Sequence, residues 1–355
     1  MPNRALVCLS GGVDSTVAAL LLQEQGYTVE GITFWLWSFP GAPDYAVKTA
    51  RRMLEDVDIA ASELGVPHCT IDASSKFYDV VIRDFQTRYR RGQTPNPCGR
   101  CNRYLRFGLA LDHADKKGFD LVATGHHARI KNEAGVWQLL RGTDPKKDQS
   151  YFLYGLRKED LPRLNFPVGN MTKGEVLSIA RSQGLHAAEL PQSQDLCFAN
   201  GGRPDFLFRK EEVGPGPIFD MDGKRIGGHN GLPRYTIGQR RGLNITANRP
   251  LYVIAIDAKK NALIVGGEEN LYADGLNANE ANFLSETIPQ AGARITAKIR
   301  YRSPAAQCTF YPISQGRFSI RFAKRQRAIT PGQIVAIYNG ERLLGGGIIE
   351  NVIGG

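Results

Sequence analysis

The sequence predicts an α/β domain on a doubly wound parallel sheet, followed by two small β domains, the last a β-barrel. Up to about residue 200, apolar strand-like runs alternate with helical patterns, and a glycine turn follows the first run. Beyond Pro204, helical periodicity gives way to short β runs separated by Gly, Pro and Asn. We therefore expect domains at residues 1–205, 206–274 and 275–355.

The elements of the first domain alternate in type along the chain. Strands are predicted at residues 5–9, 29–35, 68–72 and 121–125. Helices are predicted at residues 16–25, 44–64, 77–91 and 104–117, the last three closed by glycine. Ligands of such sheets lie at the carboxyl ends of the strands, so we expect Gly11 and the segment 125–127 to share a crevice.

Two hairpins define the β domains. One joins residues 252–257 to 262–266, and the other joins 334–338 to 343–349 through Asn339-Gly340, a strong hairpin turn signal.

Composition indicates a soluble protein with a basic carboxyl-terminal part. Hydrophobic residues make up 42% of the chain and charged residues 23%, and no apolar stretch approaches the roughly 20 residues of a membrane span. No signal-peptide pattern precedes the first strand, so we expect a cytoplasmic protein without membrane contact. Residues 206–355 carry +8 of the net charge of +10. This excess favours a polyanion such as RNA or DNA, although a merely basic surface explains it equally well.

The glycine turn Ser10-Gly11-Gly12-Val13-Asp14-Ser15 has the pattern of a phosphate cradle. Adjacent glycines and a helix amino terminus present unpaired N–H groups to an anion. No Gly-Lys-Ser/Thr ending follows, so this is not the familiar P-loop and we expect no lysine to reach the outer phosphates. Asp14 is placed to bind magnesium or to cap the helix, and the plainer alternative is an ordinary capped turn.

Cysteines cluster in a second candidate site. Cys98 and Cys101 follow Thr94-Pro95-Asn96-Pro97, where two prolines predict an exposed loop, and seven arginines between residues 83 and 106 predict lowered thiol pKa values. Cys197 lies on another predicted loop. The spacing leaves three uses open: structural zinc completed by His113, His126 or His127, an iron–sulfur cluster on three thiolates, or a transient disulfide between Cys101 and Cys197.

The other cysteines and polar motifs have plainer alternatives. Cys8, Cys69 and Cys308 fall in apolar runs and are expected to be small buried hydrophobes. The segment Lys147-Asp148-Gln149-Ser150 reads first as a loop and helix cap, and the histidines after the fourth strand as hydrogen-bonded side chains. Arg300-Tyr301-Arg302 and residues 324–327 suit phosphate contact and base stacking, or a solvated barrel face.

Taken together, the ordered motifs resemble those of the tRNA-specific 2-thiouridylases of the MnmA/TrmU type over nearly the whole chain. The glycine turn alone is shared with many ATP pyrophosphatases, whereas the ordered set is specific. The matching segments are residues 10–15, 94–102, 123–127, 147–153, 195–198, 231–243, 300–302, 330–333 and 344–349.

The resemblance implies an ATP pyrophosphatase domain of the PP-loop, adenine nucleotide alpha hydrolase-like type. It implies that ATP is bound by Cys8, Leu9, Ser10, Gly11, Gly12, Val13, Asp14, Ser15, Phe34 and Gly125. It implies that tRNA is contacted by Asn96, Pro97, Cys98, His126, Lys147, Asp148, Gln149, Arg300, Tyr301 and Gln333. Asp14, Cys101 and Cys197 would then be catalytic, Cys101 as the nucleophile and Cys197 as the carrier of a persulfide.

The implied reaction replaces the C2 oxygen of the wobble uridine with sulfur in tRNAs for Lys, Glu and Gln, using ATP and Mg²⁺. It also implies a sulfur donor, either a cysteine desulfurase or a relay protein. One departure matters: Cys98 stands where the better-known pattern has aspartate, which resembles members thought to hold a [4Fe–4S] cluster on Cys98, Cys101 and Cys197. Two rival functions are an amidating ligase of the ATP pyrophosphatase class and a non-catalytic RNA-binding module with structural zinc.

Overall fold

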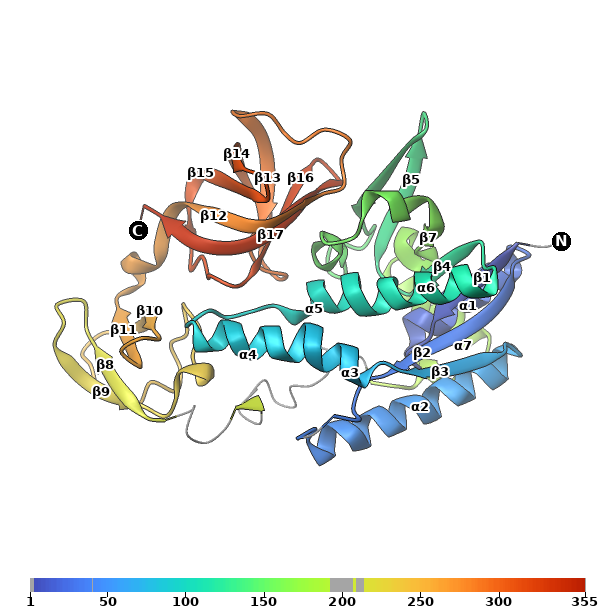
Figure 1. The fold of residues 1–355 in the computed structure, drawn as a ribbon, viewed down its shortest axis with the longest axis horizontal. Coiled ribbons are helices and arrows are strands. Elements are labelled where there is room, and N and C mark those ends of the chain that lie inside the picture. The colour runs from blue at the N-terminus through green and yellow to red at the C-terminus, as the bar shows by residue number, and fades with distance from the viewer. Residues whose placement is uncertain (1–2, 40, 192–206, 209–213, 355) are drawn as a thin grey trace.

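The computed structural model describes residues 3–39, 41–191, 207–208 and 214–354. Figure 1 shows three regions: a parallel sheet with its helices towards the N-terminus, a barrel beside it, and a small sheet at the opposite end. None of the helices within these residues is both long enough and apolar enough to cross a membrane.

The first region is built on a five-stranded parallel sheet of order β3-β2-β1-β4-β7. The strands are β1 (Arg4–Cys8), β2 (Thr28–Trp35), β3 (His68–Asp72), β4 (Leu121–Thr124) and β7 (Leu164–Asn165). The chain leaves β1 towards β2 on one side and returns through β4 on the other, so the switch point lies between β1 and β4. Residues that follow these two strands are therefore placed at the expected ligand crevice.

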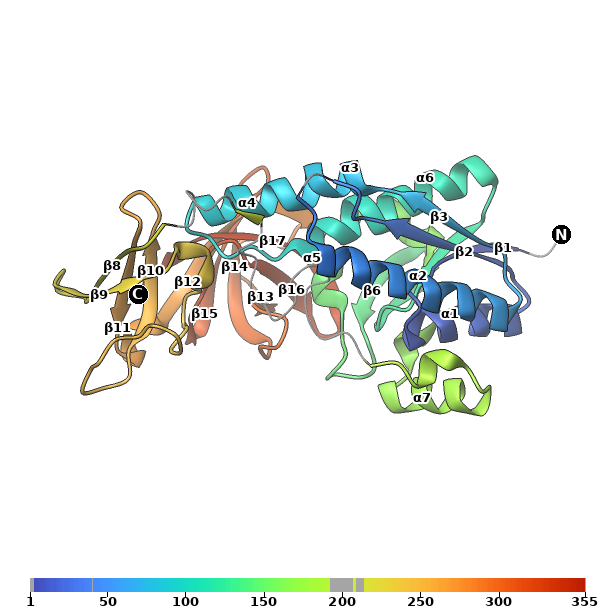
Figure 2. The same cartoon turned by 90° about the horizontal axis from the view of Figure 1, so that it is seen from below.

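Helices cover both faces of this sheet, which confirms the doubly wound prediction. Figure 2 shows α6 on one side and α1, α2 and α7 on the other. Alternate β1 residues divide accordingly, because Ala5 and Val7 pack with α1 and α2 whereas Leu6 packs with α6. The helices are α1 (Val13–Glu24), α2 (Asp44–Leu64), α3 (Ser74–Phe77), the π-helix η1 (Tyr78–Ile82), α4 (Arg83–Arg90), α5 (Pro97–Arg100), the π-helix η2 (Cys101–Phe107), α6 (Gly108–Lys117) and α7 (Lys173–Ser182).

The remaining strands form two β assemblies. A four-stranded sheet of order β10-β11-β8-β9 contains β8 (Gly216–Phe219), β9 (Arg225–His229), β10 (Tyr252–Asp257) and β11 (Ala262–Gly266). The barrel contains β12 (Tyr272–Phe283), β13 (Ala293–Lys298), β14 (Ala306–Ser314), β15 (Arg317–Arg327), β16 (Ile334–Asn339) and β17 (Arg342–Ile353), and is closed by β12 pairing with β17. Short 3₁₀ turns are η3 (Ser150–Leu153), η4 (Lys158–Arg163), η5 (Pro167–Asn170), η6 (His186–Ala188), η10 (Leu232–Arg234) and η11 (Glu268–Leu271).

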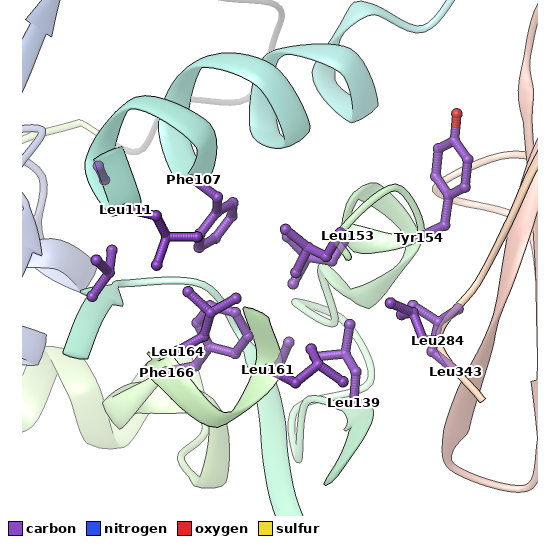
Figure 3. Close-up of a cluster of buried hydrophobic side chains, with 14 of the residues drawn as sticks. Phe107, Leu111, Leu139, Leu153, Tyr154, Leu161, Leu164, Phe166, Leu284 and Leu343 are labelled. Atoms are coloured by element: carbon purple, nitrogen blue, oxygen red, sulfur yellow. The ribbon is translucent and has the colours of Figure 1, made fainter. Parts of the chain in front are cut away.

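One hairpin from the amino-terminal half belongs to the barrel sheet. Strands β5 (Ala128–Glu133) and β6 (Val136–Arg141) pair antiparallel, and β6 joins β17 through Leu140 and Arg342. Figure 3 shows the shared core beside this junction, where Leu284 and Leu343 of the barrel face Leu139 and Leu153. The barrel is thus fixed against the parallel sheet by both backbone pairing and apolar burial.

Candidate nucleotide and sulfur site

The glycine turn forms an open cradle of backbone N–H groups. Gly12 is extended at the N-cap of α1 and no side chain caps the helix. Within the described residues, the N–H groups of Gly11, Gly12, Val13 and Asp14 have no hydrogen-bond acceptor. The Ser15 hydroxyl braces the turn, since it donates to the Gly12 carbonyl at 2.9 Å and accepts from the Ser10 N–H at 3.1 Å. Four free donors at a helix amino terminus suit a phosphate group.

Two glycines allow the backbone to close around this cradle. Gly11 has φ +71°, and a Cβ there would lie 2.7 Å from the Asp56 Cβ of α2. A Cβ on Gly125 would overlap the backbone of Asp14 and Ser15. The loop after β4 therefore lies directly on the first turn of α1, so the two predicted segments are neighbours.

A lysine reaches the cradle from a distant part of the chain. Lys173 Nζ lies 2.6 Å from Asp14 Oδ1, and His127 Nε2 lies 3.3 Å from the same oxygen. Lys173 is the first residue of α7, where a capping box of Thr172 and Glu175 fixes the helix start. The sequence analysis missed this residue. The Thr-x-x-Glu pattern marks the helix start, but nothing local indicates that the helix packs beside α1.

The charge on Asp14 is already balanced within the protein. Burial raises its pKa, but hydrogen bonds from His127 and Lys173 outweigh burial and bring the pKa below its usual value. The carboxylate is therefore ionised and shares Oδ1 with two donors. Among the described residues no group of three carboxylate, histidine or cysteine side chains forms a metal site. Asp14 thus does not form a protein cage for a divalent cation.

The predicted cysteine loop is helical, which corrects the expectation of an exposed loop. Asn96 caps α5, since its Oδ1 accepts from the Cys98 N–H at 3.1 Å, and Pro97 occupies the first helical position. Proline is tolerated there because that N–H has no helical partner. Cys98 and Cys101 are partly buried, and Gly99 packs flat against Tyr154 and Ile334.

The predicted lowering of the thiol pKa values is wrong for this structure. Burial raises the pKa of Cys98 to about 12, with Cys101 adding to the rise and Arg106 opposing it. Burial likewise raises the pKa of Cys101, again opposed by Arg106. Both thiols are therefore protonated at neutral pH in this conformation.

Carboxylates offset part of the arginine charge in this segment. Arg88 pairs with Asp84 at 2.9 Å and with Glu280 of β12, and Arg100 pairs with Glu280 at 3.0 Å. Arg83 pairs with Asp79. Because Glu280 is far away in sequence, counting acids within the arginine-rich window could not reveal this pairing.

For the cysteines predicted to be buried, the prediction is confirmed at two positions and wrong at one. Cys8 and Cys308 are buried, as expected. Cys69 is exposed on β3, which corrects the prediction of a buried side chain, because β3 is an edge strand of the sheet. Cys197 lies outside the described residues, so its position stays a prediction.

Side chains on η2 connect the cysteines to the cradle. Arg106 Nη1 lies 3.3 Å from His126 Nε2 and 3.5 Å from Asn102 Oδ1. His126 Nδ1 lies 2.6 Å from Thr124 Oγ1, and burial together with Arg106 lowers the pKa of His126 well below 6.5. The imidazole is therefore neutral and accepts from Arg106. Since Gly125 abuts Asp14, the cysteine helix and the cradle are linked through this contact.

One residue implied in tRNA binding, Gln149, contacts the loop that follows β4. Gln149 exchanges hydrogen bonds with the His127 backbone at 2.9 Å in each direction. Asp148 is 4% exposed and accepts from the N–H groups of Gly142 and Ser150 at 3.1 and 3.0 Å. Asp148 thus holds the loop that carries Lys147. Phe34, near the end of β2, is partly buried against the α6 side of the sheet.

The barrel contributes further residues of the set implied in tRNA binding. Gln333 Nε2 donates to the Thr94 carbonyl at 2.7 Å, beside the segment Asn96-Pro97. The Tyr301 ring lies 4.6 Å from that of Phe152. One Arg300 nitrogen, Nη2, donates to Ala328 at 2.7 Å and to Thr330 at 2.6 Å, which fixes the guanidinium at the barrel end.

Three family models together match most of the chain. A model described as the tRNA methyl transferase HUP domain matches residues 3–201, a tRNA methyl transferase PRC-barrel domain matches residues 204–267, and an aminomethyltransferase beta-barrel domain matches residues 273–349. Their order agrees with the predicted parallel-sheet domain and two β domains.

Curated relatives match at full length. A tRNA-specific 2-thiouridylase MnmA of Roseiflexus castenholzii is 42% identical, with 98% of this chain and 99% of the relative covered. A tRNA-specific 2-thiouridylase MnmA 1 of Syntrophus aciditrophicus is 44% identical, with 99% and 94% covered. A third, of Geotalea uraniireducens, is 41% identical, with 99% and 96% covered. The chain belongs to the MnmA family of tRNA-specific 2-thiouridylases.

Proposed function

We propose that this chain is a tRNA-uridine 2-sulfurtransferase that uses ATP to replace the C2 oxygen of the wobble uridine in tRNAs for Lys, Glu and Gln. The carrying observation is the contact chain from the cysteine helix to the phosphate cradle, through Arg106 and His126 to Gly125. Nucleotide activation and sulfur chemistry need adjacent sites, and this contact brings them together.

The cradle suits the triphosphate of ATP. Free N–H groups of Gly11 to Asp14 bind phosphate oxygens, and the Lys173 ammonium supplies the cation that the missing P-loop lysine would provide. Mg²⁺ enters with ATP as part of the substrate. Asp14 holds Lys173 and His127 in place through Oδ1, and its carboxylate is a candidate contact for the MgATP complex.

The chemistry proceeds in two substitutions. The uridine C2 oxygen attacks the α-phosphorus, the bond to the bridging oxygen breaks, and pyrophosphate leaves. Sulfur then attacks C2, and the C2–oxygen bond breaks to release AMP and a proton. In the persulfide route, the Cys101 thiolate attacks the inner sulfur of the Cys197 persulfide and releases hydrosulfide, which leaves a disulfide for an external thiol to reduce.

The raised pKa of the Cys101 thiol opposes the persulfide route, because the thiolate is the attacking species. Cys101 is protonated in the conformation described, so the reaction needs either deprotonation on tRNA binding or a rearrangement around α5. The target uracil must leave its stack to reach this helix, which places RNA beside Asn96, Pro97 and Cys98.

A cluster route is the alternative. A [4Fe–4S] cluster would use Cys98, Cys101 and Cys197, and the first two lie three residues apart across the junction of α5 and η2. The described residues supply only two of these thiols. Two measurements distinguish the routes. Iron and sulfide analysis after anaerobic purification tests for the cluster itself. Full activity of a metal-free Cys98→Ser enzyme rejects the cluster route. The sulfur donor is then a cysteine desulfurase or a relay protein.

Binding of tRNA uses the loop at Lys147 to Gln149, His126, and the barrel residues Arg300, Tyr301 and Gln333. The basic carboxyl-terminal part, with its +8 excess, holds the RNA backbone. We retain the domain limits 1–205, 206–274 and 275–355, with the β5–β6 hairpin attached to the barrel sheet, and a cytoplasmic location.

The test is product analysis. Unmodified tRNA is incubated with MgATP and a persulfide donor, and nucleosides, AMP and pyrophosphate are measured. We expect 2-thiouridine with equal AMP, no product with Cys101→Ser, and normal product with Cys69→Ser, the matched exposed cysteine. AMP formation that does not require tRNA supports an amidating ligase instead, and tRNA binding without ATP consumption supports a non-catalytic module.

A further inference from the structure

Among the described residues, Arg106 has no carboxylate partner, and in this it resembles Arg103 but differs from three other arginines of the segment. Arg83, Arg88 and Arg100 all pair with acids. Arg103 lies over the ring of Tyr104 at 5.1 Å. The Arg106 guanidinium, which is partly buried, has only the neutral acceptors His126 and Asn102 at 3.3 and 3.5 Å. A partly buried cation without a counterion is costly, so its site favours an anionic ligand.

Neighbouring residues hold this guanidinium at the boundary between the two halves of the site. Arg106 follows Cys101 by five residues within the π-helix η2, whose i to i+5 repeat brings the two towards one face. Its carbonyl accepts from Cys8 Sγ at 4.0 Å, which ties η2 to the end of β1 just before the cradle. Its side chain contacts His126, next to the Gly125 that abuts Asp14.

Lys173 and Arg106 approach the cradle through consecutive histidines. Lys173 shares Asp14 Oδ1 with His127, whereas Arg106 contacts His126. The two cations thus belong to different sides of the site. Lys173 lies at the first turn of α1, where the pyrophosphate portion binds, and Arg106 lies on the side of the cysteines.

We propose that Arg106 is a catalytic residue that binds the α-phosphate of the adenylated uridine and stabilises AMP as it leaves. This inference rests on the proposed function. Before sulfur attack, the phosphate joins two esters and carries one negative charge. When the C2–oxygen bond breaks, its electron pair stays on oxygen and the phosphate of AMP gains a second charge. A fixed guanidinium therefore interacts more strongly with the transition state than with the bound intermediate.

The side chain is suited to this task in two respects. Guanidinium donors can bind two phosphate oxygens at once, which lysine cannot do with the same geometry. His126 cannot serve as the cation, because its buried ring is neutral and already accepts from Arg106. We assign His126 and Asn102 as positioning residues for Arg106.

The experiment compares Arg106→Gln and Arg106→Lys with Arg103→Gln, which removes the same charge from the same helix. We expect Arg106→Gln to bind MgATP within about threefold of wild type but to release AMP and form 2-thiouridine roughly 100-fold more slowly in single turnovers. Arg106→Lys recovers part of the rate because it keeps the charge, and Arg103→Gln behaves as wild type.

A binding measurement separates this role from a structural one and from the function itself. We expect the affinity for AMP to fall about tenfold or more in Arg106→Gln, with unchanged unfolding temperature and unchanged AMP affinity in Arg103→Gln. Wild-type AMP affinity in Arg106→Gln overturns the proposal, as does an equal loss of MgATP affinity. If Arg106→Gln does not fold, the same comparison is made with Arg106→Lys. If the wild-type enzyme forms no 2-thiouridine, the proposed function is wrong. The AMP affinities still test whether Arg106 binds the phosphate.

Discussion

Replacing Lys173 with methionine tests whether this residue is the phosphate cation of the cradle. Its ammonium lies 2.6 Å from Asp14 Oδ1 and the residue is 8% exposed. At an effective dielectric constant of about 20, unit charges at this distance attract by roughly 6 kcal/mol. Desolvation of the buried ammonium offsets most of this attraction, so we expect a net coupling to Asp14 of about 1–3 kcal/mol.

A double-mutant cycle measures this coupling. Lys173→Met, Asp14→Asn and the double variant are unfolded in urea, and MgATP is titrated into each. Lys173→Met should destabilise the protein by about 1–3 kcal/mol because it leaves Asp14 without its closest cation. It should weaken MgATP binding roughly ten- to hundredfold through loss of one charge-assisted hydrogen bond. Lys116→Met, an exposed lysine at the end of α6, is the control.

Two results would refute this reasoning. One is additivity within about 0.5 kcal/mol, which would mean that Lys173 and Asp14 do not interact in solution. The other is wild-type MgATP affinity in a folded Lys173→Met protein, which would leave the cradle N–H groups as the sole phosphate contacts.

Three further predictions follow from the same geometry. Gly125→Ala should cost about 1–3 kcal/mol and abolish MgATP binding, because its Cβ would overlap Asp14, whereas Gly174→Ala, with an open position in α7, should be neutral or stabilising in urea unfolding. The free energy of unfolding should fall by about 1.4 kcal/mol per pH unit below about 6.5 through His126, because the imidazole is protonated in the unfolded chain but stays neutral when buried. His126→Gln should remove that part of the slope. Binding of tRNA should weaken tenfold or more from about 50 to 200 mM salt, and salt-independent affinity would contradict the basic-surface assignment.

Local sequence pattern was sufficient for most of the parallel sheet. Strand β3 and helix α2 begin and end where predicted. Their limits are set by local signals, namely apolar periodicity and Gly65 at the end of α2. The contact between the loop at Gly125 and the first turn of α1 was also predictable, because parallel strands fix which loops meet. These features depend on short-range information and on one general rule of topology.

Features that depend on distant contacts were not predictable in this way. Proline suggested a loop before Cys98, but the Asn96 cap and the packing of Gly99 on Tyr154 make the segment helical. The β5–β6 hairpin was absent from the predicted elements, and its place in the barrel sheet depends on a distant pairing of β6 with β17. Lys173 escaped notice for the same reason, since only the packing of α7 beside α1 brings it to Asp14.

Burial raises both thiol pKa values, and part of the arginine charge that was expected to lower them is offset by a carboxylate of the barrel. One residue is added to β12 where it pairs with β17 between Asn279 and Asn282, and Glu280 within this irregularity has φ +48°. Its carboxylate points away from the barrel to Arg88 and Arg100. The positive charge of the arginine-rich segment is thus used to attach the cysteine helix to the barrel.

This attachment fixes the cysteine helix between the barrel and the parallel-sheet region. Glu280 and Gly99 fix α5 against the barrel, while Arg106, on the continuation of the same helix, faces the parallel sheet. A variant that weakens the barrel contact should slow sulfur transfer more than it weakens nucleotide binding. The reason is that Lys173 and the cradle N–H groups belong wholly to the parallel-sheet region.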